Sequence, residues 1–166
     1  MSNNNQSILS QRQIEAQLLK PIIEGLSSVY DEESIINNIR STIEKIAFED
    51  GQKLKEEHKS RSLSIIAEHW RKLSEGDSLV IDDFTVSGSL LTFRITLCRY
   101  AEYYKKLKAE KLGEALSCCR DKAFLNGFSE NIEMCRSKTI LEGNPSCDFI
   151  YSYKADKEKQ QTQVHL

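Results

Sequence analysis

The residues of this chain that could do chemistry are its thiols and the charged side chains near them. Cys118 and Asp121 are three positions apart, so they would share one face of a helix. The carboxylate would raise the pKa of the thiol, whereas Arg94, Arg99 or Arg136 could lower it again. The cysteines are Cys98, Cys118, Cys119, Cys135 and Cys147. Their odd number and their spacing argue against a disulfide framework.

Three interpretations of these cysteines are open at this point. They could be buried core residues, they could include a nucleophile, or they could bind a metal ion. The ligands of such a metal would be Cys98, Cys118, Cys147 and Asp121. No CxxC or paired-histidine spacing supports a metal, and no phosphate loop, Ser-His-Asp pattern or dinucleotide fingerprint is present. Apart from that metal, we therefore expect no cofactor.

Composition narrows the class of partner. The chain has 166 residues, 39% hydrophobic and 29% charged, with a net charge of -2, which is ordinary for a folded protein and does not favour nucleic acid. No run reaches the roughly 18 apolar residues of a membrane span, and the N-terminus lacks the features of a secretory signal. We therefore expect a cytoplasmic protein with reduced cysteines whose partner is a small-molecule substrate.

The first half of the chain has helical periodicity. Apolar residues recur at three- and four-residue spacing over 14–26, 35–47 and 54–72. Pro21 could kink the first of these helices, and Asp31 could cap the second. The apolar faces could cover a sheet or form the surface of a homodimer.

The second half alternates between strands and helices. Ser87-Gly88 and Gly143-Asn144-Pro145 predict turns between strands, and Gly127 predicts the end of a helix. Strands are expected at 79–86, 90–98, 132–141 and 147–153, and helices at 99–107 and 112–124.

This order of elements predicts an α+β fold. N-terminal helices pack on a small antiparallel sheet of about four strands, with two inserted helices. We expect one domain over residues 11–153, preceded by a disordered N-terminus at 1–10 and followed by a flexible tail at 154–166.

Period-two alternation assigns the side chains of the second strand to two faces. Leu91, Phe93, Ile95 and Leu97 form the apolar face, and Thr92, Arg94, Thr96 and Cys98 form the polar face. A polar face that ends in a thiol suits the wall of a pocket. The alternative is a solvent face with an incidental cysteine.

Three motifs give the chain a resemblance to a known family. The first, CRYAE, holds Cys98 and Tyr100, the second, LGEALSCCRD, ends at Asp121, and the third, RSKTILEGNPSCDF, runs from Arg136 to Phe149. Over residues 90–153 this pattern resembles the L-2-amino-thiazoline-4-carboxylic acid hydrolase family. Members of that family open the thiazoline ring of a cyclic isothiourea to give N-carbamoyl-cysteine.

The resemblance implies a hydrolase that opens a thiazoline or related cyclic amidine ring by adding water at the amidine carbon, with cleavage of C–N or C–S bonds. It implies Asp121 as the group that holds the amidinium, and Cys98 or Cys118 as the nucleophile or as a metal ligand. Cys147 would complete either arrangement. The substrate-binding candidates are Arg94, Tyr100, Arg136 and Glu142.

Two alternatives accompany this prediction. Glu142 and Asp148 lie beside the turn at Gly143, and their role could be purely structural, to hold that turn in place. The Gly-x-x-x-Cys-x-Phe ending also resembles vinyl-reductase-type domains, which implies a non-catalytic domain that binds a small ligand.

Overall fold

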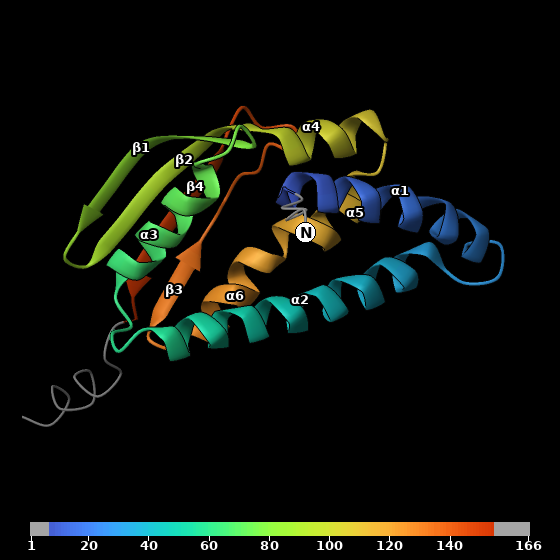
Figure 1. Ribbon diagram of the computed structural model, residues 1–166. Helices are drawn as coiled ribbons and strands as arrows, with labels where there is room; N and C mark the ends of the chain where they lie inside the picture. The colour runs from blue at the N-terminus through green and yellow to red at the C-terminus, as the bar shows by residue number, and fades with distance from the viewer. Residues whose placement is uncertain (1–6, 155–166) are drawn as a thin grey trace, which may run out of the picture.

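The computed structural model describes residues 7–154, and Figure 1 shows helices gathered against one β-sheet. The expected N-terminal disorder at 1–6 and the tail from 155 on lie outside these residues. Residues 8–10, which we also expected to be disordered, form the first turn of a helix, because the Ser7 hydroxyl caps it by accepting from the Ser10 amide at 3.1 Å.

The three N-terminal helices are α1 (Ile8–Leu26), α2 (Glu32–Glu57) and α3 (Leu63–Ser74). Pro21 lies inside α1, which continues beyond it to Leu26. Asp31 caps α2 as expected and accepts from the Ser34 amide at 2.8 Å. The predicted start of the third helix at Leu54 was wrong, because α2 continues through this region and the polar stretch 58–62 separates it from α3. In the part of the chain that the structure describes, no helix has the length and apolarity to cross a membrane.

The strands are β1 (Leu79–Ser87), β2 (Leu90–Cys98), β3 (Ile132–Cys135) and β4 (Cys147–Tyr153). They form one antiparallel sheet in the order β1-β2-β4-β3, which confirms the predicted α+β class. Figure 1 shows α3 lying across this sheet. The ring centroid of Trp70 in α3 lies 5.0 Å from that of Phe93 and 4.8 Å from that of Phe149. The core of this layer is therefore aromatic.

The connection from β2 to β3 contains α4 (Arg99–Lys106), α5 (Glu110–Gly113), the π-helical turn η1 (Glu114–Cys118) and α6 (Arg120–Phe128). The predicted helix end at Gly127 was wrong. Gly127 faces α2, and a Cβ added to it would lie 2.0 Å from the Phe48 carbonyl oxygen. A Cβ added to Gly51 of α2 would lie equally close to the Phe124 carbonyl oxygen. These glycines let α2 and α6 touch backbone to backbone, which places α6 between α2 and the sheet (Figure 1).

The third strand is shorter than predicted and ends at Cys135 instead of continuing to residue 141. The Asp148 carboxylate accepts from the backbone amides of Ser137 at 2.9 Å and Lys138 at 2.7 Å. These amides are therefore not available to a sheet ladder, and residues 136–146 form an irregular segment whose turn contains Gly143 at a φ of 99°.

Candidate active site

A cavity of about 410 Å³ lies where the helices meet the end of β2 and the beginning of β4. The structure brings the four predicted catalytic residues together in its lining, although they come from three distant segments. The reactive and polar residues in the lining include Cys98, Tyr100, Tyr104, Ser117, Cys118, Asp121, Arg136 and Cys147. Their placement makes this cavity the candidate site.

The sheet contributes two of the thiols. Cys98 is the last residue of β2 and the N-cap of α4, and its sulfur accepts from the Ala101 amide at 3.4 Å. Cys147 is the first residue of β4, and its sulfur accepts from the Ile140 amide at 3.2 Å. Because both thiols lie where a strand meets irregular or helical backbone, amide donors are free to reach them.

The helical side contributes Cys118 and Asp121. Cys118 closes the π-helical turn, in which the Cys119 amide reaches back to the Glu114 carbonyl at 3.0 Å. This wider turn separates the two neighbouring thiols: Cys118 lines the cavity, while the Cys119 sulfur donates to the Ala115 carbonyl at 3.2 Å. A π-helical turn of this kind often lies at a functional site.

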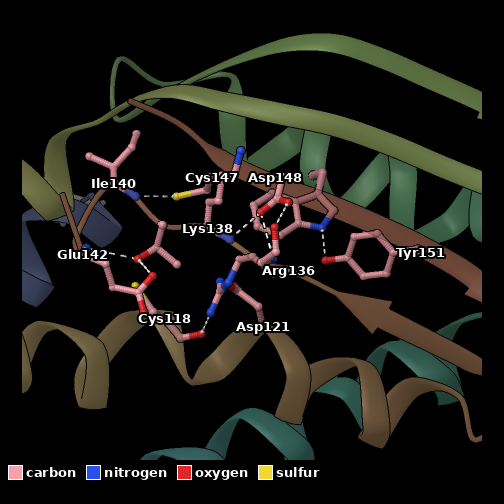
Figure 2. A network of polar contacts seen from close by, with 12 residues as sticks. Cys118, Asp121, Arg136, Lys138, Ile140, Glu142, Cys147, Asp148 and Tyr151 are labelled. Carbon is pink, nitrogen blue, oxygen red and sulfur yellow. Dashed lines mark hydrogen bonds and ion pairs between the residues drawn. The ribbon is translucent and has the colours of Figure 1, made fainter. Parts of the chain in front are cut away.

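Arg136 connects the two sides of the cavity. Its Nη1 donates to Asp121 Oδ2 at 2.5 Å, and its Nη2 donates to the Cys118 carbonyl at 3.0 Å (Figure 2). The guanidinium also lies over the Phe149 ring, 5.2 Å from its centroid. The ion pair is largely buried, with 15% of the arginine side chain and 22% of the aspartate side chain exposed. Dissolved salt therefore weakens this ion pair much less than it would weaken an exposed one.

Burial governs the protonation of the thiols. It raises the pKa of Cys98 to about 11 and the pKa of Cys118 well above its usual value, and it raises the pKa of Cys147 as well. A negative charge on Cys147 also raises the pKa of Cys98, and a negative charge on either of them raises the pKa of Cys118, so the groups share one electrostatic environment. At neutral pH all three are therefore uncharged thiols in the free protein.

Asp121 has a pKa closer to neutrality than an ordinary aspartate. Burial raises it to about 6, and the nearby Arg136 opposes part of that rise through its charge and its hydrogen bond. A carboxylate with such a pKa can accept and return a proton near neutral pH.

The predicted site residues did not include several residues of the cavity wall. Tyr104 and Ser117 share a hydrogen bond of 2.9 Å between their hydroxyl groups, and His69 stacks on Phe124 with ring centroids 4.3 Å apart. Burial lowers the pKa of His69 to about 4, so its imidazole is neutral. Their positions depend on how α3, α4 and α6 pack, and no local sequence signal reports that packing.

Arg94 does not belong to the site. It lies on the solvent face of β2, where its Nε donates to Asp83 at 2.7 Å. The predicted polar pocket wall was therefore wrong for Arg94 and for Thr96, which donates to Asp82 at 2.6 Å. Cys98 nevertheless reaches the cavity, because the strict alternation of the strand is interrupted before it.

A β-bulge causes this interruption. Val80 pairs with Leu97, whereas the next residue of β1, Ile81, pairs with Ile95, so one extra residue of β2 is inserted at Thr96. The insertion shifts the alternation by one position. Ile95 and Cys98 consequently line the same cavity.

Glu142 also lies outside the cavity lining. Its carboxylate accepts from the Thr139 hydroxyl at 2.7 Å and braces the turn before Gly143, as Figure 2 shows. The structure therefore corrects its assignment to substrate binding, and Asp148 has the bracing role described above.

The metal alternative concerns the same four residues. Within residues 7–154, no group of three or more histidine, cysteine, aspartate or glutamate side chains is arranged to hold a metal ion. Cys98, Cys118, Cys147 and Asp121 thus share a cavity without forming a ligand set.

Comparison with known proteins identifies the family. The sequence pattern of the L-2-amino-thiazoline-4-carboxylic acid hydrolase family matches residues 11–151. The chain belongs to this family, which confirms the resemblance seen in its motifs. No curated protein shows significant similarity to the chain.

Several chains of solved structures match this chain, one of them at low sequence identity. It is a trafficking protein particle complex subunit 3 from Naegleria fowleri, covalently bound to palmitic acid. It has a TM-score of 0.47 and 13% identity, and the match covers 87% of this chain and 96% of that one.

Proposed function

We propose that this protein is a hydrolase that opens a thiazoline or related cyclic amidine ring by adding water at the amidine carbon. The observation that carries the proposal is the buried ion pair of Asp121 and Arg136 beside three thiols in one cavity. A 2-aminothiazoline-4-carboxylate has an amidinium and a carboxylate. It can therefore replace both halves of the ion pair, with its amidinium on Asp121 and its carboxylate on Arg136.

Cys98 is the nucleophile in this proposal. Its sulfur already accepts from the Ala101 amide, and the Tyr100 amide also lowers its pKa, against the larger opposing effect of burial. It lies at the N-terminus of α4, where the helix dipole favours a thiolate. Cys118 is less suited, because burial raises its pKa further and the charge of Asp121 adds to that rise.

Two steps complete the reaction. In the first, the Cys98 sulfur bonds to the amidine carbon, the bond from that carbon to the ring sulfur breaks, and the thiol proton passes through Asp121 to the departing sulfur. In the second, water attacks the same carbon and the bond to Cys98 breaks. One proton of the water returns to Cys98, the other stays with the product as its oxygen becomes a urea carbonyl, and the extra proton of the amidinium is released.

A second candidate function is binding of a cyclic amidine without turnover. The observation that favours it is the raised pKa of all three thiols that line the cavity, which leaves no thiolate in the free protein. In the catalytic proposal the positive charge of the bound amidinium offsets this effect, because an adjacent cation lowers a thiol pKa.

The deciding experiment incubates the full chain with L-2-amino-thiazoline-4-carboxylate and with imidazoline and unsubstituted thiazoline analogues. Mass spectrometry then detects a product heavier by one water molecule, and the free thiol released by ring opening is titrated. The catalytic proposal expects the added mass for every compound that is hydrolysed, and the free thiol only for the thiazolines, because an imidazoline ring contains no sulfur. Binding measured by calorimetry with neither signal favours the second candidate, and absence of binding and turnover across the panel contradicts both.

A further inference from the structure

The cavity continues beyond the thiols as an apolar chamber between α3 and the sheet. The lining of this apolar chamber comprises Ile66, Trp70, Leu73, Leu79, Ile95 and Phe149. Ile95 pairs with Cys147 across β2 and β4, and Phe149 lies two residues farther along β4 on the same face. The apolar chamber therefore begins directly beside the thiols.

The size of the cavity exceeds what a single small ring needs. An engineered cavity of about 150 Å³ is enough to bind benzene, whereas this cavity measures about 410 Å³. An aminothiazoline carboxylate is only somewhat larger than benzene. Bound at Asp121 and Arg136, it would leave the apolar chamber unfilled.

Of the six residues that line the apolar chamber, only Trp70 has a polar side-chain atom. His69 of α3 also lines the cavity, where it stacks on Phe124. The indole Nε1 of Trp70 already donates to the Tyr151 hydroxyl at 2.9 Å, and a dashed line marks this bond at Tyr151 in Figure 2. In the described part of the chain, no buried side-chain nitrogen or oxygen lacks a hydrogen-bond partner. A polar substituent placed among these six side chains would lose hydrogen bonds to water that they do not replace.

We infer that the substrate is a cyclic amidine carboxylate that bears an apolar alkyl or aryl substituent. This inference rests on the proposed function for the polar end of the substrate. The amidine ring lies among Cys98, Asp121 and Arg136, and the substituent fills the apolar chamber between α3 and the sheet. Ile8 and Gln11 are the exposed residues of the cavity lining, so the substrate enters past the beginning of α1.

The test compares 2-amino-thiazoline-4-carboxylate with its N-butyl, N-octyl and N-benzyl analogues. Turnover of each compound is measured with the wild-type chain, and affinity is measured by calorimetry with the Cys98→Ala variant, which binds without reacting. Affinity and kcat/KM should rise by about fourfold for each methylene buried, until the apolar chamber is full. Equal or falling values along the series overturn the inference.

A variant that narrows the apolar chamber gives an independent test. Leu73 is half-buried on α3, so Leu73→Trp should lower kcat/KM for the octyl analogue at least tenfold more than for the unsubstituted compound. Leu54→Trp is the matched control, because Leu54 is equally half-buried and packs on the same core without lining the cavity. It should leave the ratio between the two substrates unchanged, and an equal effect of both variants contradicts the inference.

The two proposals fail in different ways. Hydrolysis of the unsubstituted compound without any gain from substituents would remove only the inferred substrate class. Absence of hydrolysis, together with affinity that rises along the series, would remove the catalytic proposal and retain an apolar ligand. Absence of both would overturn the inference as well.

Discussion

Arg136 Nη1 lies 2.5 Å from Asp121 Oδ2, and this contact joins the backbone just after β3 to the first turn of α6. It closes one wall of the cavity and sets the charge of the site. Arg136 also donates to the Cys118 carbonyl, so the same guanidinium orients the π-helical turn. The positions of the base, the Cys118 thiol and the carboxylate-binding group thus depend on one side chain.

Asp121→Asn should reduce turnover by at least about a hundredfold, because the amide cannot accept the proton that the reaction must move. Rates are measured by thiol release, and circular dichroism checks that the fold is intact. The matched control is Asp83→Asn, which alters an aspartate paired with Arg94 on the outer face of β2. Wild-type rates in Asp121→Asn would contradict the assigned role.

The rate should depend on pH through Asp121. Because burial raises its pKa to about 6, the ionised form is lost as pH falls through that value, and kcat/KM should decline on the acid side there. Arg136→Gln removes a cation that lowers this pKa, so the acid limb should move to higher pH and KM for the carboxylate substrate should rise. An acid limb at the same pH in both proteins would show that another group controls it.

Cys98→Ala should abolish turnover while the melting temperature stays within a few degrees of the wild type. Cys98→Ser keeps nearly the same volume but is a weaker nucleophile, so it should also be inactive. Cys135→Ala is the control, because Cys135 is an exposed thiol on β3 outside the cavity lining. If Cys118→Ala alone abolished turnover and Cys98→Ala did not, the nucleophile would be Cys118.

Gly127→Ala should destabilise the protein, because the new methyl group would lie 2.0 Å from the Phe48 carbonyl and force α2 and α6 apart. Overpacking of this kind costs about 1–3 kcal/mol, which lowers the melting temperature of a chain of this size by about 3–10 °C. Gly25→Ala is the matched control in α1, where no atom lies within 4 Å of the added Cβ. It should be neutral or stabilising by up to about 1 kcal/mol, and equal melting temperatures of the two variants would contradict the close packing.

Local patterns in the sequence were enough to predict much of the fold. Helical spacing identified the buried face of α3, including Ile66 and Trp70, and the Asp31 cap predicted the start of α2. The hairpin at Ser87-Gly88 and the antiparallel sheet also followed from turn residues and alternation. These features depend on neighbours in the chain, which is why one sequence is enough to predict them.

The family motifs also predicted residues that line the cavity. Cys98, Cys118, Asp121 and Cys147 lie in one cavity, as the motifs implied that they should. Their catalytic roles stay predictions, which the variants above test.

Only the tertiary structure decided the remaining features. The bulge at Thr96 moved Cys98 to the cavity and left Arg94 on the solvent face, against strict alternation. Gly127 resembles a helix terminator in sequence but serves a close contact with α2. The pairing of Arg136 with Asp121 and the apolar chamber beneath α3 likewise arise between segments far apart in the chain. Such contacts depend on how surfaces pack in three dimensions, and the spacing of residues along a single sequence does not predict that packing.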